Sequence, residues 1–448
     1  MHDYATPFKG KRITILGLGL LGRGVGDVAF LAKCGAKVLV TDKKNGSELA
    51  ASVEKLKHYS NVQFKLGGHD PEDFKHCDMV LKAAGVRLDS PEVALARQSG
   101  IPVVMSTALF AHYAAEAGVK IVGVTGTRGK STITHMLHHT LKSVGKRVHL
   151  GGNVRGLSTL ALLSEVEAGD IAVLELDSWQ LQGFGELKMS PHIAIFSNLM
   201  PDHQNYYKNM EEYFADKANI FRYQKPGDTF IAGNGLTKRL QTPQPVEALV
   251  PEGLPADWML KVPGEHNRHN AALAAAALLA LGLNSEQIRA GLESFEGVEG
   301  RLQLVAEKNG VKIYNDNNAT TPEATIAALK ALHESRSPNR EAGIVLIVGG
   351  SDKGLELGNL AAEIRNSCKT VVLLSGTGTG KLASILDSRF TIPDSSPHDS
   401  LSSAVQKALE LASAGDIILF SPAFASFGMF KNEYERNDQF LEIVNQLR

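Results

Sequence analysis

The chain has 448 residues, of which 43% are hydrophobic and 21% are charged, and its formal net charge at pH 7 is -1. A chain of this length accommodates about three domains of ~100–200 residues, and each can bury a core of its own. The balanced charge excludes a strongly basic protein, so we expect neither nucleic acid nor a membrane surface as a partner.

The cysteines Cys34, Cys77 and Cys368 are far apart and show no CxxC spacing. This pattern is typical of a reducing compartment rather than of a disulfide framework or a zinc site. The first residues lack the apolar stretch of a signal peptide. The longest apolar run, residues 271–283, is too short to span a bilayer and predicts a buried helix. We therefore expect a soluble cytoplasmic protein.

Strands and helices are predicted to alternate along the chain, which is typical of doubly wound α/β layers. The N-terminal part has expected strands at residues 12–16, 36–42, 78–83 and 101–106, with a helix over 24–33. The central part has expected strands at 119–124, 170–176 and 192–199, with an amphipathic helix after the first of them. The C-terminal part has expected strands at 311–316, 343–350, 369–376 and 416–422, with helices at 322–334 and 401–412.

These elements predict an α/β protein of three domains. We expect a Rossmann-like domain over residues 1–115, a central P-loop domain over residues 116–299, and a second Rossmann-like domain over residues 300–448.

The first motif, "ILGLGLLGRG", contains an unbroken G-x-G-x-x-G at Gly17, Gly19 and Gly22. It follows a predicted strand and opens a helix, and Asp42 lies about 20 residues further on, as in a dinucleotide fingerprint. The glycines let the backbone approach a pyrophosphate at the start of the helix. Taken alone, the motif favours NAD(P) or FAD, with another nucleotide or a structural turn as alternatives.

The second motif, "GVTGTRGKST", is close to a P-loop, but Val124 stands where the first glycine of the strict pattern belongs. Gly126 and Gly129 are present, and Lys130 and Ser131 follow. Successive backbone amides can surround phosphate oxygens, while the lysine reaches the β- and γ-phosphates and the serine ligates Mg²⁺. This motif moves the expected chemistry to the central domain.

Acidic residues follow the next predicted strands of the central domain. Glu175 and Asp177 stand at the end of one strand, and Asp202 and His203 follow another. Sites of α/β sheets open at such strand ends, so these residues are candidates for metal binding. Capping of a loop is the alternative for one of the first two acids.

Motifs in a fixed order along nearly the whole chain resemble the Mur ligase family of ATP-dependent amide-forming enzymes. They are "TGTRGKST", "LELDSWQ", "NLMPDHQNYY", "YFADKANIF", "GEHNRHNAALAAAA", "GRLQ", "YNDNNATTPEAT", "GGSDKG" and "SPAFASFGMFKN". The "GLGLLG" turn and "NDNNAT" are most similar to the branch that adds D-glutamate to UDP-N-acetylmuramoyl-L-alanine in peptidoglycan precursor synthesis. The resemblance implies an acyl-phosphate intermediate, three small-molecule substrates and a monomer.

The resemblance also implies roles for individual residues. ATP is expected to contact Gly126, Thr127, Gly129, Lys130, Ser131, Thr132, Asn267, Asn270, Arg301 and Asp316. Two Mg²⁺ ions are expected at Ser131, Glu175, His203 and Lys217, and the catalytic residues are Lys130, Glu175, His203 and Lys217. Lys217 occupies the position of the family's carbamylated lysine; a carbamate offers the oxygen ligands that Mg²⁺ prefers.

The substrates are assigned in the same way. The UDP-linked substrate is expected at Gly19, Leu20, Leu21, Asp42, Asn153 and Gln180, and the incoming amino acid at Thr320, Lys353, Ser426 and Phe427. The sequence departs from the D-glutamate-adding pattern at Leu21, Arg128, Asp177, Asn318, Glu433 and Asn437. The alternatives are therefore a ligase that adds another amino acid such as L-glutamate, an NAD-dependent oxidoreductase, and a non-catalytic nucleotide-binding module.

Overall fold

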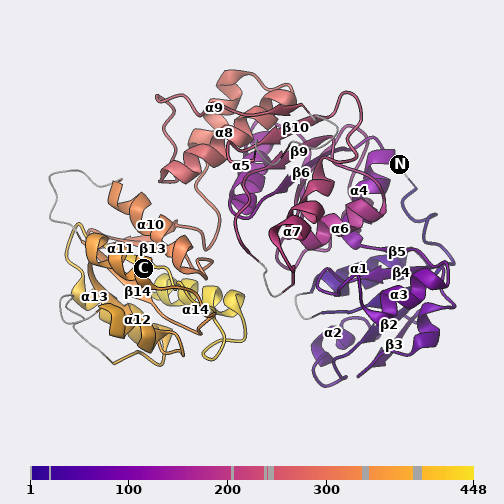
Figure 1. Ribbon diagram of the computed structural model, residues 1–448, viewed down its shortest axis with the longest axis horizontal. Coiled ribbons are helices and arrows are strands. Elements are labelled where there is room, and N and C mark those ends of the chain that lie inside the picture. The colour runs from indigo at the N-terminus through magenta and orange to yellow at the C-terminus, as the bar shows by residue number, and fades with distance from the viewer. Residues whose placement is uncertain are drawn as a thin grey trace. The chain divides into compact units, whose positions relative to one another are not determined.

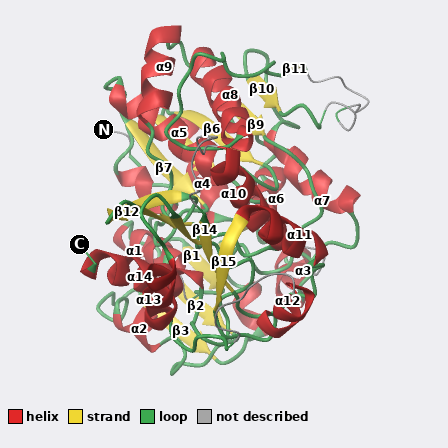
Figure 2. Ribbon diagram, turned by 90° about the vertical axis from the view of Figure 1, so that its left-hand side faces the viewer, coloured by secondary structure: helices red, strands yellow, loops and turns green. Residues whose placement is uncertain are grey.

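The computed structural model describes residues 3–19, 22–202, 206–236, 240, 247–334, 343–386 and 396–447. The chain forms two compact units (Figure 1). One unit comprises residues 1–255 and 270–292, and the other comprises residues 256–269 and 293–448. Figure 2 shows the helices and strands coloured by type.

The first sheet has the strand order β3-β2-β1-β4-β5 and is parallel throughout. Its strands are β1 (Arg12–Leu16), β2 (Lys37–Asp42), β3 (Val62–Leu66), β4 (Met79–Lys82) and β5 (Val103–Val104). The accompanying helices are α1 (Arg23–Lys33), α2 (Ala50–Glu54), α3 (Pro91–Gln98) and α4 (Ser106–Glu116), with a 3₁₀ turn at Pro71–Phe74. The direction in which successive strands are added to the sheet reverses between β1 and β4. Ligands of such sheets bind at the carboxyl ends of the two strands that flank this reversal.

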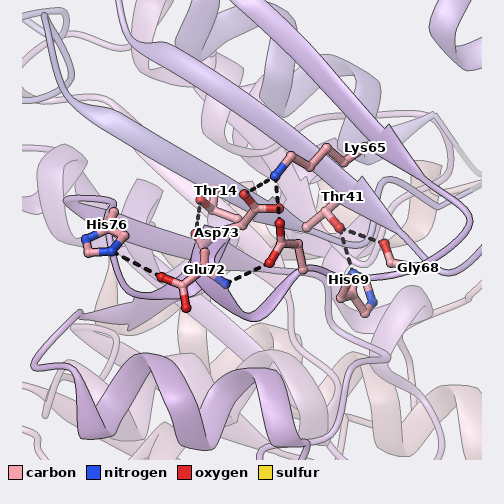
Figure 3. A network of polar contacts seen from close by, with 9 residues as sticks. Thr14, Thr41, Lys65, Gly68, His69, Glu72, Asp73 and His76 are labelled. Atoms are coloured by element: carbon pink, nitrogen blue, oxygen red, sulfur yellow. Dashed lines mark hydrogen bonds and ion pairs between the residues drawn. The ribbon is translucent and has the colours of Figure 1, made fainter.

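Ile13 and Ile15 point into the apolar cluster on one face of this sheet. A polar network that includes Thr14 and Lys65 joins the sheet to the segment after β3 (Figure 3). The Lys65 ammonium donates to Asp73 Oδ1 at 2.6 Å and to Asp70 Oδ2 at 3.2 Å. The Thr14 hydroxyl donates to the Asp73 carbonyl at 2.8 Å. These contacts tie the β3–β4 connection to the sheet, so we assign them a structural role.

The second sheet, also parallel, has the order β11-β10-β9-β6-β8-β7. Its strands are β6 (Lys120–Thr125), β7 (Val148–Gly152), β8 (Ile171–Glu175), β9 (Ile193–Phe196), β10 (Thr229–Ala232) and β11 (Ala248–Leu249). The helices are α5 (Lys130–Ser143), α6 (Ser178–Glu186), α7 (Met210–Lys217), α8 (Glu265–Ala280) and α9 (Ser285–Ser294), with 3₁₀ turns at Leu160–Ser164 and Ala218–Ile220. The central strand β6 leads directly into the predicted phosphate loop.

The third sheet has the order β12-β13-β16-β14-β15, and only its β12–β13 pair is antiparallel among the described strands. Its strands are β12 (Gln303–Lys308), β13 (Val311–Asn315), β14 (Ile344–Val348), β15 (Cys368–Leu373) and β16 (Ile417–Phe420). The helices are α10 (Pro322–Glu334), α11 (Gly358–Ser367), α12 (Thr379–Leu386), α13 (Leu401–Leu411) and α14 (Glu433–Gln446). Alternate β14 side chains enter two separate apolar clusters, because successive side chains of a strand point to opposite faces.

The expected α/β class with parallel sheets is confirmed. The apolar run at 271–283 falls largely in α8, where Ala271, Leu273 and Leu278 are fully buried. In the described part of the chain, no helix combines the length and apolar character needed to cross a membrane. The domain boundaries near residues 115 and 299 stay predictions.

Candidate active site

The turn between β6 and α5 is braced by residues that follow the neighbouring strand β9. The Arg128 amide donates to Asn198 Oδ1 at 2.9 Å, and the Arg128 carbonyl accepts from the Ser197 hydroxyl at 2.5 Å. The Thr127 amide donates to the Asn198 carbonyl at 2.9 Å. Gly129 caps α5 in a left-handed conformation, with φ 85°. A rigid turn of this kind at a helix N-terminus presents backbone amides to an anion.

Lys130 is the first residue of α5 and lies over this turn. Its Nζ donates to the carbonyls of Gly126 at 3.1 Å and Thr127 at 3.2 Å. Ser131 and Thr132 follow in the first turn of the helix. The structure thus places the residues that the motif assigned to phosphate and metal around one turn, although their roles stay predictions.

Gly126→Ala is expected to disrupt this turn. A Cβ at position 126 would lie 1.9 Å from Ser197 Oγ, and φ there is +145°, a value that L-residues rarely adopt. We expect ATP-analogue affinity to fall about tenfold or more, with a loss of roughly 1–3 kcal/mol in the free energy of unfolding. Titration calorimetry and denaturant unfolding measure the two effects. Gly145→Ala is the matched control, because φ is +74° there and no atom lies within 4 Å of the added Cβ. Equal losses in the two variants would contradict the steric account.

Lys217 ends α7 and reaches the same turn, although it is distant in sequence. Its side chain is buried, with a residue exposure of 1%. Nζ donates to the Gly126 carbonyl at 2.9 Å and to Thr125 Oγ1 at 3.3 Å, and it lies 4.9 Å from the centre of the Tyr213 ring. Burial, and then the charge of Lys130, hold the pKa of the Lys217 ammonium well below its usual range. A neutral amine at this position is chemically a nucleophile.

Glu175, the last residue of β8, is the acidic group best suited to a metal ion. The residue is only 4% exposed, and within the described part of the chain its carboxylate has no hydrogen-bond or ion-pair partner. A carboxylate at the carboxyl end of a strand that has no protein partner can ligate a cation, and Mg²⁺ accepts such oxygen ligands. The donor set therefore fits the metal that the motifs imply.

The other metal candidates have different outcomes. Asp177 caps α6: its carboxylate accepts from the Gln180 amide at 2.7 Å, and the Gln180 side chain returns a bond to the Asp177 amide. Asp177 therefore has the capping role that was the alternative interpretation. His203 lies outside the described residues. Those residues contain no group of three or more His, Cys, Asp or Glu side chains arranged to hold a metal ion.

The first glycine-rich turn borders a cavity of about 230 Å³. Gly17 and Gly19 line it from the first sheet, and Thr107 and Gln180 line it from segments further along the chain. Gln180 donates through Nε2 to Thr107 Oγ1 at 3.0 Å. Leu20 and Leu21 lie outside the described residues. The cavity is therefore lined by residues of two sheet regions of the same unit.

Asp42 and Asn153 support this cavity from outside its lining. Asp42 Oδ2 accepts from the amides of Leu18 at 2.8 Å and Gly19 at 3.4 Å, so the carboxylate holds the glycine-rich turn. The Asn153 amide donates to the Glu175 carbonyl at 2.8 Å. This bond connects the expected substrate residue Asn153 to the strand that ends in the candidate metal ligand.

The residues expected to bind the amino acid come together in the C-terminal sheet region. Lys353 Nζ donates to Thr320 Oγ1 at 3.1 Å. Ser426 is buried, whereas Phe427 is 62% exposed. The Phe427 carbonyl accepts a hydrogen bond from the Ser351 hydroxyl. Lys353 is a suitable partner for a carboxylate group, so this grouping agrees with the expected role without testing it.

The residues expected to bind the base and ribose lie in different parts of α8 and the third sheet. A Cβ at Gly129 would lie 2.3 Å from Asn270 Oδ1, so Asn270 contacts the phosphate loop directly. Asn267 donates to the Pro263 carbonyl at 2.8 Å. Asp316 is buried and accepts from the Ser421 hydroxyl at 2.7 Å.

Asp316 makes stability depend on pH. Burial raises the pKa of its carboxyl from 3.8 to about 7. Between these values the folded chain keeps a proton that the unfolded chain releases, so the free energy of unfolding falls as pH rises through this window. Asp316→Asn removes this contribution. We expect the Tm of the variant relative to wild type to rise by a few degrees from about pH 5 to about pH 8. Calorimetry at both pH values measures it; a constant difference in Tm would contradict the assignment.

Three of the unusual positions form one amide cluster. Asn437 Oδ1 accepts from Asn315 Nδ2 at 2.9 Å, and Asn437 Nδ2 donates to Glu299 Oε1 at 2.7 Å. Asn318 Nδ2 donates to the Glu299 carbonyl at 3.3 Å. Asn317 Nδ2 donates to Asn318 Oδ1 at 3.2 Å and to the carbonyl of Glu433, the first residue of α14, at 2.9 Å. The side chain of Asn437 therefore joins Asn315 and Glu299 through two hydrogen bonds.

Comparison with known proteins now decides the family. A Mur ligase MurD-like N-terminal domain matches residues 11–105, a Mur ligase middle domain matches residues 124–245, and a Mur ligase glutamate ligase domain matches residues 300–424. The chain belongs to the Mur ligase family.

Individual relatives agree with this Mur ligase assignment over the full length. A UDP-N-acetylmuramoylalanine–D-glutamate ligase of Roseiflexus sp. (strain RS-1) is 36% identical over 474 residues, covering 97% of this chain and 98% of the relative. The protein of the same name from Borreliella afzelii (strain PKo) is 34% identical over 468 residues, covering 98% of each.

Solved Mur ligases share the fold. The UDP-N-acetylmuramate-alanine ligase MurC of Thermotoga maritima has a TM-score of 0.63 at 20% identity, covering 98% of this chain and all (100%) of that one. The MurF ligase of Thermotoga maritima in complex with ADP has a TM-score of 0.60 at 17% identity, covering 100% of this chain and 99% of that one. At these identities the likeness establishes the architecture alone.

Several residues of this Mur ligase site had not been singled out in the sequence. Ser197 and Asn198 brace the phosphate loop, and Arg23, Asp27 and Lys82 line the cavity beside the glycine-rich turn. The position of Asn198, immediately after a buried strand, was a usable signal. The others depend on contacts between distant segments, for which the sequence carries no local pattern.

Proposed function

We propose that this Mur ligase joins D-glutamate to UDP-N-acetylmuramoyl-L-alanine in an ATP-dependent reaction. Its full-length relatives at 36% and 34% identity carry that name. The observation that carries the proposal is the convergence of Lys130 and Lys217 on the Gly126 carbonyl of the phosphate loop. The unpartnered Glu175 carboxylate at the end of β8 supports it.

The first step is phosphoryl transfer to the substrate carboxylate. The carboxylate oxygen attacks the γ-phosphorus of ATP, ADP leaves, and an acyl phosphate results. The amides of the 126–129 turn and the Lys130 ammonium would stabilise the charge that develops on the transferred group. Ser131 and Glu175 would hold Mg²⁺, which when bound neutralises phosphate charge. Two ions, with His203 and Lys217 as further ligands, are part of the proposal.

Lys217 is suited to carbamylation. Addition of CO₂ needs a neutral amine, and burial lowers the pKa of this ammonium well below its usual range. The carbamate would change a buried cation into an oxygen ligand. Its carbonyl partner at Gly126 would then face an anion across the 2.9 Å contact, so the side chain would turn from that carbonyl towards a metal ion.

The second step forms the amide bond. The amino group of glutamate attacks the acyl carbon, phosphate leaves, and the nitrogen loses a proton. Lys353 and Thr320 would hold the side chain of the incoming amino acid, with Ser426 and Phe427 beside them. The cavity at the glycine-rich turn would hold the UDP part of the first substrate. The glycine-rich motif would then bind a nucleotide-linked substrate and not NAD. We also propose that the protein is a monomer and that it acts in the cytoplasm, where its nucleotide substrates would be available.

Phosphate release tests the proposed function. Purified protein with ATP and Mg²⁺ should release phosphate only when UDP-N-acetylmuramoyl-L-alanine and an amino acid are both present. A panel with D-glutamate, L-glutamate and other amino acids identifies the second substrate. If L-glutamate is the only amino acid of the panel that supports phosphate release, the alternative ligase is supported. If the protein binds NADH and releases phosphate with none of the amino acids, the proposal is contradicted.

A further inference from the structure

The cavity beside the glycine-rich turn has two basic side chains among its described lining residues, Arg23 and Lys82. A diphosphate that enters this cavity needs positive charge as well as backbone amides, because two phosphate groups carry about two negative charges. The two side chains differ in how many of their N–H donors already form hydrogen bonds within the protein.

Lys82 is committed to the protein. It is the last residue of β4 and only 2% exposed. Its Nζ donates to the Val86 carbonyl at 2.7 Å and to the Ala83 carbonyl at 3.3 Å, which closes the loop after β4. Burial lowers its pKa to about 8. Lys82 therefore shapes the wall of the cavity.

Arg23 is available to a ligand. It is the first residue of α1, directly after the left-handed Gly22, and it is half-buried. Its Nη1 donates to Asn153 Oδ1 at 2.9 Å, and it has no carboxylate within salt-bridge distance among the described residues. A guanidinium has five N–H donors, so most of its donors remain for an anion.

The segment that carries Arg23 is held in place against the central part of the chain. A Cβ at Gly26 would lie 2.5 Å from Ser158 Cβ, which shows how closely α1 approaches that segment. Asp27 Oδ1 accepts from the Ser158 hydroxyl at 2.6 Å, and burial raises the pKa of Asp27 to about 6. Asp27, which interacts electrostatically with Arg23, is thus engaged by a hydroxyl, and α1 places Arg23 at one edge of the cavity.

We infer that Arg23 binds the diphosphate of the UDP-linked substrate, with its guanidinium oriented by Asn153. The start of α1 supplies backbone amides, and Arg23 supplies the charge and a planar set of donors that match phosphate oxygens. The inference rests on the proposed function, because it assumes that the cavity receives a uridine diphosphate group.

The test compares UDP and uridine as probes, with affinities measured by titration calorimetry. Arg23→Ala is expected to weaken UDP binding by about 10- to 100-fold and to leave uridine binding within about twofold. Arg23→Gln, which can still donate to Asn153 but carries no charge, should show the same selective loss. Lys33→Ala removes one charge at the other end of α1 and should bind UDP as wild type does.

Each outcome is informative. Affinity for an ATP analogue and the thermal unfolding midpoint report folding, and Arg23→Gln decides the matter if Arg23→Ala fails to fold. Wild-type affinity for UDP in either folded variant would overturn the inference and leave the proposed function standing. Equal losses for UDP and uridine would also overturn it, because the effect would not depend on phosphate. Wild-type protein that binds no UDP would overturn both.

Discussion

Lys130→Ala is expected to reduce ATP-dependent phosphate release by at least about 10²- to 10³-fold, the usual effect of removing one group that stabilises transition-state charge. Lys130 Nζ lies over the phosphate loop, 3.1 Å from the Gly126 carbonyl and 3.2 Å from the Thr127 carbonyl. The loss should appear mainly in kcat, because the interaction strengthens as the γ-phosphoryl group is transferred. Steady-state phosphate release measures it.

The matched control is Lys142→Ala, in the last turn of the same helix. Lys142 is exposed and distant from the phosphate loop in the helix, so we expect near-normal turnover. Circular dichroism and thermal unfolding should show both variants to be folded. Near-normal turnover of Lys130→Ala would refute the assignment of the phosphate site.

Lys217→Ala is the second substitution with a large expected effect. We expect phosphate release to fall about 10²-fold or more, because the buried oxygen ligand that a carbamate would supply is lost. Added acetate or formate should restore part of the activity, since a small carboxylate fits the space that the lysine side chain leaves. The measurement is phosphate release against the concentration of the added carboxylate.

Carbamylation also predicts a dependence on bicarbonate. Burial lowers the pKa of the Lys217 ammonium and so favours the neutral amine that reacts with CO₂. We expect ¹³C-labelled bicarbonate to give a carbamate signal in wild type that is absent in Lys217→Ala. Lys225→Ala, at an exposed position just after this segment, is the control and should keep the signal. A folded Lys217→Ala variant without carboxylate rescue, together with no signal in wild type, would remove the carbamate from the account.

Local sequence patterns predicted the parts of the fold that depend on local chemistry. The expected strand at residues 12–16 is β1, residue for residue, because its run of buried apolar side chains is bounded by a charged start and a glycine turn. The helix after the phosphate loop was equally recognisable. Strand β3 was not predicted: Gln63 and Lys65 are exposed, and Lys65 belongs to the polar network (Figure 3), so the segment has too few apolar residues to suggest a buried strand.

The candidate site was predictable only in part, because local sequence patterns do not show which distant segments come into contact. The glycine spacing indicated a phosphate loop, because the requirement for tight turns is local. The contact between Lys217 and the Gly126 carbonyl joins positions separated by 91 residues, and the Arg23–Asn153 bond joins positions separated by 130. No periodicity encodes such contacts; they arise from the packing of parallel strands whose carboxyl ends share one edge.

The most direct measurement of the central claim is the identity of the product. Purified protein is incubated with ATP, Mg²⁺, UDP-N-acetylmuramoyl-L-alanine and either D- or L-glutamate, and the products are analysed by liquid chromatography with mass spectrometry. The account predicts a UDP-linked product extended by one glutamyl residue with D-glutamate, formed in equal amount with ADP and phosphate. A product with L-glutamate only, or no extended product while NADH is bound, would contradict it.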